Sequence, residues 1–276
     1  MLKVFKMMTW LFLVLFGVFL AIGLYLFFNQ GRMVFIPMKE LAITPDELNL
    51  VFEDVLIEVV PEQKIHAWYF PSLAGKKTVL FCHGNAGNIS HRLETVQFLT
   101  SFNVNVLLFD YRGYGRSDGK PSEAGVYEDA LAAFNWLVRE KNIANSDIIL
   151  FGRSLGGAVA VETALKVPCG GVIVESSFTS VAELGQKMFP FFPVRYLLRY
   201  KFDSAAKIGL LSCPVLITHS PDDDIIPFEM GRKLYNLAPE PKYFIELCGS
   251  HNDREYLNSI SYINGIRKFL FSETGN

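Results

Sequence analysis

One uncharged apolar segment, from Met7 to Phe28, restricts the fold of this chain more than any other feature of its sequence. Its roughly 22 residues are enough for a single helix to cross the ~30 Å hydrocarbon core of a bilayer. Trp10 and Tyr25 lie near the two ends of the segment, where amphipathic rings favour the membrane interface. The sequence therefore predicts a transmembrane helix at about 7–28, within an amino-terminal membrane anchor of residues 1–30.

A cleaved signal peptide is the alternative interpretation of this segment. Signal peptides have a shorter apolar region that ends at a cleavage site made of small residues. Here the apolar run ends with the bulky residues Leu24–Phe28, which favours an uncleaved anchor. The amino terminus with Lys3 and Lys6 narrowly outweighs Arg32 and Lys39 in positive charge, so the positive-inside rule favours an extracytoplasmic position for the rest of the chain.

Composition excludes several other classes of protein. Half of the 276 residues are apolar and 14% are aromatic, whereas a disordered chain lacks such apolar surface. The 26 basic and 28 acidic residues nearly cancel, so we expect no basic surface that would bind nucleic acid. The four cysteines form no C-x-x-C pair, and neither a metal ion nor an organic cofactor is predicted.

Short apolar runs alternate with amphipathic stretches through residues 51–272, which follow a predicted linker at 31–50. Val51–Val60 and Lys64–Phe70 are expected to form a hairpin. The other strand-like runs are Thr78–Cys82, Val104–Phe109, Ile148–Phe151, Gly171–Val174, Val215–Thr218 and Tyr243–Leu247. The helix-like stretches are Ile89–Ser101, Ser122–Lys141, Leu155–Val167, Phe228–Leu237 and Asp253–Phe271. This alternation predicts one α/β domain with a mostly parallel sheet flanked by helices.

The sequence Gly152-Arg153-Ser154-Leu155-Gly156 stands between a strand-like run and a helix-like stretch. In that setting G-x-S-x-G is typical of a nucleophile elbow, a tight turn that presents the serine oxygen above the sheet. The pattern alone is common, but the strand before it and the helix after it favour a nucleophilic Ser154 over a surface serine in a mere turn.

A nucleophilic serine needs a histidine base that is itself oriented by a carboxylate, and after an elbow of this type the acid precedes the histidine. Asp222–Asp224 follow the strand-like run at 215–218, and His251 is the one histidine in the remainder of the chain. The order Ser154, Asp223, His251 therefore fits a catalytic triad, with the two neighbouring aspartates as alternatives for the acid.

Two backbone amides are expected to stabilise the oxyanion of such a reaction. One is the amide of Leu155, the residue after the nucleophile. The other should come from the loop after Thr78–Cys82, whose small residues let backbone N–H groups approach a substrate carbonyl. We assign it to Asn85, with Ala86 as the alternative. A phosphate-binding role for this loop is disfavoured, because no Lys-Ser/Thr pair follows it.

Aromatic residues are dense in a segment at about 178–204, where folds of this kind often carry an inserted cap. We predict a small apolar lid there, with Phe189, Phe192 and Tyr196 binding the substrate. The alternative is that these rings simply pack on the sheet.

With these residues in place, the sequence resembles the α/β-hydrolase superfamily and, within it, the membrane-anchored bud-emergence-forty-six-like group that includes α/β-hydrolase domain-containing protein thirteen. The resemblance is carried by FCHGNAGNISHR at 81–92, DYRGYGRS at 110–117, FGRSLGGAVA at 151–160, FFPVRY at 191–196 and HND at 251–253. It implies an eight-stranded, mostly parallel sheet with Ser154 as nucleophile and His251 as base. It also selects Asp223 as the acid, because the family's acid stands four positions after the residue matched by His219. Ser220 departs from the family, which usually has glycine there.

Together these observations predict a single-pass, membrane-anchored serine hydrolase. It would cleave carboxylic ester or thioester bonds of acyl-lipid, acyl-protein or small acyl substrates through an acyl-enzyme. A serine aminopeptidase-like peptidase is the enzymatic alternative, and a membrane-tethered scaffold without turnover is the non-enzymatic one. The expected partners are an acyl substrate and the lipid bilayer; the sequence leaves the oligomeric state open.

Overall fold

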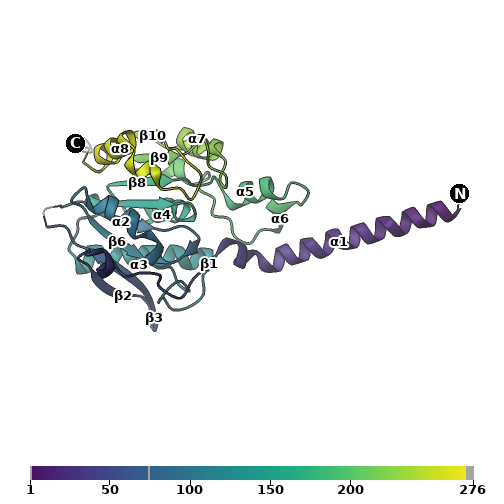
Figure 1. Ribbon diagram of the computed structural model, residues 1–276, viewed down its shortest axis with the longest axis horizontal. Helices are drawn as coiled ribbons and strands as arrows, with labels where there is room; N and C mark the ends of the chain where they lie inside the picture. Colours follow the sequence, from purple (N-terminus) through teal and green to yellow (C-terminus); the bar gives the residue numbers. More distant parts are fainter. Residues whose placement is uncertain (1, 74, 272–276) are drawn as a thin grey trace.

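A computed structural model describes residues 2–73 and 75–271 of the chain (Figure 1). Its main feature is an eight-stranded sheet with the strand order β10-β9-β8-β7-β4-β6-β3-β2. The strands are β2 Glu53–Val60, β3 Gln63–Phe70, β4 Thr78–Cys82, β6 Asn105–Phe109, β7 Ile148–Arg153, β8 Gly171–Glu175, β9 Val215–His219 and β10 Lys242–Glu246. Only β3 runs against its neighbours β2 and β6, so the predicted mostly parallel, eight-stranded sheet is confirmed.

Helices cover both faces of this sheet. They are α2 Leu93–Thr100, α3 Glu123–Glu140, α4 Leu155–Lys166, α7 Phe228–Leu237 and α8 Ile260–Phe271. Successive residues of a strand point to opposite faces. In β4, Leu80 and Cys82 accordingly join the core beneath α3, α4 and α7, whereas Val79 and Phe81 join the core beneath α2 and α8. The strand bounds differ from the predicted ones by at most two residues. Residues buried on both faces mark the central strands β4, β6, β7, β8 and β9, whereas the edge strands β2 and β10 are mostly exposed or half-buried.

Several short elements complete the chain. They are β1 Ile36–Pro37, β5 Ala86–Gly87, α5 Val181–Met188, α6 Val194–Leu197, and the 3₁₀ turns η1 Pro45–Leu48, η2 Ile89–Arg92, η3 Asn145–Asp147, η4 Ile208–Leu210 and η5 Glu255–Asn258. The predicted helices at 89–101 and 253–271 each consist of a 3₁₀ turn followed by an α-helix. The α5–α6 lobe projects from the domain and lies beside the domain-proximal part of the first helix (Figure 1).

The first helix, α1, runs from Leu2 to Val34 and projects from the domain (Figure 1). Its most apolar 18-residue window has a mean hydropathy of 2.7 and no buried residue, so α1 is a candidate membrane span. It is longer at both ends than the predicted span of 7–28. Its last turns carry Gln30, which is buried against the α5–α6 lobe, and this tertiary contact continues the helix beyond the apolar run.

Residues 31–50 are not the free linker that the sequence predicts. After α1, Phe35 is 3% exposed in the core, and β1 pairs in parallel with β5. The next residues are held as well, because Asn88 donates side-chain hydrogen bonds to the carbonyls of Met38 and Glu40. The segment is therefore a strap along the domain. No apolar periodicity marks these residues, because many of their contacts with the domain are backbone hydrogen bonds. The predicted domain end at residue 272 lies outside the described residues.

Candidate active site

Ser154 stands at the turn from β7 into α4, with φ 55° and ψ −120°. A non-glycine residue with positive φ is strained and is typically retained at a functional site. The turn is tight: a Cβ on Gly152 would lie 2.1 Å from the carbonyl oxygen of Gly156, and one on Gly156 would lie 1.9 Å from that of Cys82. The two glycines of the motif are thus required by close backbone contacts. The turn leaves the Ser154 side chain at the carboxyl end of the sheet.

His251 joins Ser154 to an aspartate. Its Nε2 lies 3.2 Å from Ser154 Oγ, and its Nδ1 lies 2.8 Å from Asp223 Oδ2. An ionised carboxylate only accepts hydrogen bonds, so Nδ1 is the protonated nitrogen and donates to Asp223. Nε2 then carries the lone pair and accepts from the serine hydroxyl. In this arrangement His251 is able to take the proton of Ser154.

The structure distinguishes the three consecutive aspartates. Asp223 Oδ1 accepts backbone hydrogen bonds from Ile225, at 3.0 Å, and Ile226, at 2.7 Å, which leaves Oδ2 for His251. Burial alone would raise the pKa of Asp223, but hydrogen bonding with His219, His251 and the Ile226 N–H lowers it well below its ordinary value. Asp224 instead accepts from the backbone N–H of His251 at 3.0 Å, and Asp222 is exposed. Only Asp223 meets the imidazole among these three.

A buried polar network holds the loop of His251. Arg153, next to the serine, donates a hydrogen bond from Nη2 to the His251 carbonyl. Its Nε lies 3.5 Å from Glu175 Oε1, a fully buried carboxylate at the end of β8. Glu175 also accepts hydrogen bonds from the hydroxyls of Tyr256 and Tyr262. Burial and the charge of Glu175 raise the pKa of both tyrosines, so their hydroxyls remain donors. An ion pair of Arg153 with a nearby acid is the expected role of an arginine beside the nucleophile, but the two tyrosines are not predictable from the sequence, because η5 and α8 bring them to Glu175 only in the folded chain.

The two predicted oxyanion donors flank the same serine. Leu155 opens α4, and the first N–H groups of a helix have no acceptor within it. On the other side, a Cβ on Gly84 would lie 3.5 Å from Ser154 Cβ, and both Asn85 and Ala86 line the adjoining pocket. The Asn85 carbonyl is turned to other partners and accepts from the Ile36 N–H at 3.0 Å. The loop therefore keeps Asn85 and Ala86 beside Ser154, and both stay candidates for the second donor.

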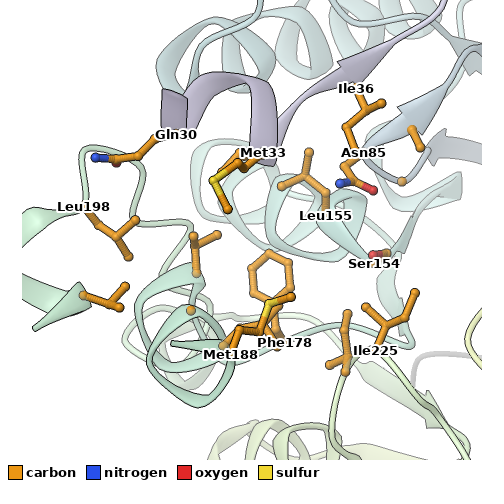
Figure 2. Close-up of a pocket in the computed structure, with 18 of the residues that line it drawn as sticks. Gln30, Met33, Ile36, Asn85, Ser154, Leu155, Phe178, Met188, Leu198 and Ile225 are labelled. Carbon is orange, nitrogen blue, oxygen red and sulfur yellow. The ribbon is translucent and has the colours of Figure 1, made fainter. Parts of the chain in front are cut away.

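A pocket of about 450 Å³ leads away from Ser154. Figure 2 shows Met33 facing Phe178 and Met188 across it, with Ser154 at one end. Most of the wall is apolar, and it includes side chains from α1 and from the α5–α6 lobe. The volume lies in the range of pockets that bind small ligands. The shape and lining suit an acyl chain whose carbonyl carbon is at the serine.

The aromatic residues of the predicted lid occupy different positions in the structure. Phe189 and Phe192 line the pocket, and their binding of substrate stays a prediction. Tyr196 does not: its side chain is 74% exposed, lies outside the pocket and hydrogen bonds with Arg195, because the single turn of α6 points it outward. Phe202 is fully buried in the main core, so the alternative of packing on the domain holds for that ring. The lid proper is therefore α5–α6, shorter than the predicted 178–204.

Two arginines line the pocket that contains Ser154, and one of them, Arg153, is paired with the buried carboxylate of Glu175. The other is Arg92, whose guanidinium donates to the Ala86 carbonyl. Burial, with the nearby charges of Arg254 and Arg153, lowers the pKa of Arg92 to about 10, so it stays charged at neutral pH. Within the described residues, no group of three or more His, Cys, Asp or Glu side chains is placed to hold a metal ion.

This chain is similar in sequence to known hydrolases and similar in fold to a solved esterase. The sequence model of a family described as "Serine aminopeptidase, S33" matches residues 74–201. The α/β-hydrolase domain-containing protein WAV2 of Arabidopsis thaliana is 34% identical over 76% of this chain and 75% of its own length. The lysophosphatidylserine lipase ABHD12 of Mus musculus is 34% identical over 72% of this chain and 56% of its own length. The esterase Pf2001 of Pyrococcus furiosus has the same fold, with a TM-score of 0.70 over 86% of this chain and 97% of that one, at 19% identity.

Proposed function

The chain belongs to the α/β-hydrolase superfamily and is a hydrolase, and from that premise we propose that it is a membrane-anchored serine hydrolase that cleaves carboxylic esters or thioesters. The observation that carries the proposal is the continuous hydrogen-bonded series from Ser154 through His251 to Asp223, at the end of an apolar pocket. Serine, imidazole and carboxylate in this order are the arrangement that activates a hydroxyl at neutral pH.

In the proposed reaction, Ser154 Oγ attacks the substrate carbonyl carbon while His251 Nε2 takes its proton. The amides of Leu155 and Asn85 stabilise the tetrahedral oxyanion, and each such donor is worth about 3–4 kcal/mol. His251 then protonates the leaving alcohol or thiol, which departs and leaves the acyl group on Ser154. Water, deprotonated by His251, attacks the acyl-enzyme and releases the acid. Asp223 keeps the imidazole in one tautomer and stabilises its protonated form.

The remainder of the proposal concerns the membrane. The length and apolarity of α1 support a single-pass anchor, and the positive charge near its start supports an extracytoplasmic domain. Phe189 and Phe192 would contact the acyl chain. A relative named as a lysophosphatidylserine lipase supports an acyl-lipid ester as the substrate class.

The name of the matching family also suggests a serine aminopeptidase. An aminopeptidase must bind the substrate's ammonium group close to the scissile bond. Here Arg92 lines the pocket that contains Ser154, and its guanidinium, which donates to a backbone carbonyl, would repel an ammonium group. The charge of Arg92 therefore favours an ester substrate over an amino-terminal peptide.

The test is a kinetic series on the full-length protein in detergent or vesicles. Substrates are p-nitrophenyl esters and acyl thioesters of increasing chain length, with alanine p-nitroanilide for the peptidase reaction. We expect ester or thioester turnover that Ser154→Ala abolishes and that the matched exposed variant Ser101→Ala retains. Turnover of the anilide alone would favour the peptidase. If no substrate is cleaved, or if Ser154→Ala is as active as wild type, the proposed function is wrong.

A further inference from the structure

The candidate membrane helix is itself part of the pocket wall. Leu26, Phe27, Gln30, Met33 and Val34 of α1 all line the cavity that contains Ser154. Residues spaced three, four or seven apart share one face of a helix. One face of the last two turns of α1 thus closes the site, although the sequence assigns those turns to an anchor and a linker.

The lid is fastened to this same helix. Gln30 is 6% exposed, and its side-chain amide donates to the Leu197 carbonyl and accepts from the Arg199 N–H, each at 2.8 Å. Farther toward the amino terminus, the ring of Phe19 stacks on that of Phe192 with centroids 4.5 Å apart. Because both the N–H and the oxygen of this buried amide are hydrogen bonded to the lobe, Gln30 fixes the position of residues 197–199 relative to α1. The α5–α6 lobe is therefore held by α1 as well as by the domain.

These contacts place the tip of the lid at membrane depth. Phe19 lies inside the predicted span, roughly 13 Å along the helix before Phe28. A bilayer around α1 would therefore also cover the part of the lid that contacts Phe19. The tip has the composition for that position: Phe191 is 87% exposed and Met188 is 60% exposed. A cationic side chain lies near the end of the predicted span, where the Arg199 guanidinium is 4.4 Å from the centroid of the Phe27 ring.

We propose that the tip of the α5–α6 lid is inserted in the bilayer leaflet beside α1, and that the acyl chain of a membrane-resident ester enters the pocket laterally and binds directly against α1. The inference rests on the proposed function for its ester, but its geometry stands on the anchor–lid contacts alone. Such a site draws its substrate from the leaflet, so the chain is never exposed to water. Met33 and Leu26 then select the acyl chain, although they belong to the anchor.

The first experiment measures where the lid tip lies. Full-length protein carrying Phe191→Cys, in a Cys248→Ser background, is labelled with a nitrobenzoxadiazole maleimide and reconstituted in phosphatidylcholine vesicles. We expect quenching by doxyl-labelled lipids and protection from aqueous iodide. The control is Ile260→Cys, exposed at the start of α8 away from α1 (Figure 1). Equal iodide quenching at the two positions would overturn the insertion of the lid.

The second experiment tests whether the acyl chain binds against the α1 side of the pocket. Met33→Trp narrows the pocket, whereas Leu24→Trp, on an exposed part of α1 outside the pocket, is the matched control. The readout is the ratio of kcat/KM for a palmitoyl ester in vesicles to that for an acetyl ester. We expect Met33→Trp to lower the ratio about tenfold, because the larger ring leaves less room for a long acyl chain than for an acetyl group, and Leu24→Trp to leave it unchanged.

The two failures can be told apart. Without any ester turnover in wild type, the proposed function fails, while the depth of the Phe191 label still decides whether the lid is inserted. With turnover present but the same ratio in Met33→Trp and Leu24→Trp, the proposed hydrolase stands and binding against α1 is wrong. The label measurement also does not depend on whether Met33→Trp folds.

Discussion

The backbone N–H of Ile36 donates a hydrogen bond of 3.0 Å to the carbonyl of Asn85. Ile36 follows the end of α1, and Asn85 lies in the loop beside Ser154, so the chain leaving the candidate membrane helix pairs directly with the proposed oxyanion loop. The Tyr114 hydroxyl also donates to this carbonyl, at 2.7 Å. The strap after α1 thus contributes to the order of the loop beside Ser154, while α1 itself contributes to the pocket wall.

Replacing Ile36 with proline should lower kcat, because proline has no N–H to hold the Asn85 carbonyl. Since the hydrogen bond from Tyr114 remains, we expect a loss of about tenfold, less than that for deleting an oxyanion donor outright. KM for a short ester should change little. Ile36→Val keeps the N–H and is the control. If both variants retain wild-type kcat, the β1–β5 pairing does not order the loop.

The three consecutive aspartates should differ sharply when each is replaced by asparagine. Asp223→Asn leaves the wrong tautomer of His251 facing Ser154, and loss of this carboxylate in a triad costs about 10⁴-fold in kcat. Asp222→Asn should be close to wild type, because Asp222 is exposed. Asp224→Asn weakens the contact to the His251 N–H and should cost far less than Asp223→Asn. Steady-state ester hydrolysis measures all three, and a greatest loss at Asp222 or Asp224 would show that the acid is misassigned.

Asp223 should also make stability depend on pH. Its pKa is lowered in the folded protein, so its charged form stabilises the fold at pH values above the ordinary carboxyl pKa of about 4. That contribution is lost as the pH falls through the lowered value. The difference in melting temperature between wild type and Asp223→Asn should therefore be more favourable to wild type at pH 7 than at pH 3. Asp222→Asn should show no such dependence, and a constant difference for Asp223→Asn would contradict the expected stabilisation.

Arg153 is expected to position His251 through its carbonyl. Arg153→Lys keeps a charge near Glu175 but loses the fork that reaches His251. We expect kcat to fall about tenfold, as for a buried hydrogen bond to a charged group, with KM for p-nitrophenyl butyrate unchanged. A parallel loss of melting temperature and of binding, without a specific effect on kcat, would show that Arg153 is only part of the core.

The parts of the molecule that were predictable from the sequence share a local signal. Strand β4, at Thr78–Cys82, has the predicted bounds because apolar residues on both faces mark a central parallel strand. The order Ser154, Asp223, His251 is visible for a similar reason, because each residue lies in the turn or loop that follows a strand-like run. Such features require only a few neighbouring residues to be recognised.

The features that escaped prediction depend on contacts between distant segments. From the sequence, Gln30 is the polar end of the predicted anchor. In the structure, its two hydrogen bonds to residues 197 and 199 connect α1 to the lid. The bond between Arg153 and His251 likewise joins residues 98 positions apart. The aromatic neighbours of Tyr196 predict a place for it in the substrate site, yet composition does not tell on which face of a single helical turn a ring lies.

The most direct test of the catalytic assignment is to map the site of a fluorophosphonate label. Wild type, Ser154→Ala and Ser101→Ala, each full length in its membrane, are treated with the probe, digested and sequenced by mass spectrometry. We predict one adduct, on the peptide that contains Ser154, in wild type and in Ser101→Ala, and no adduct in Ser154→Ala. An unlabelled wild type, or an adduct that persists in Ser154→Ala, would contradict the assignment of Ser154 as the nucleophile.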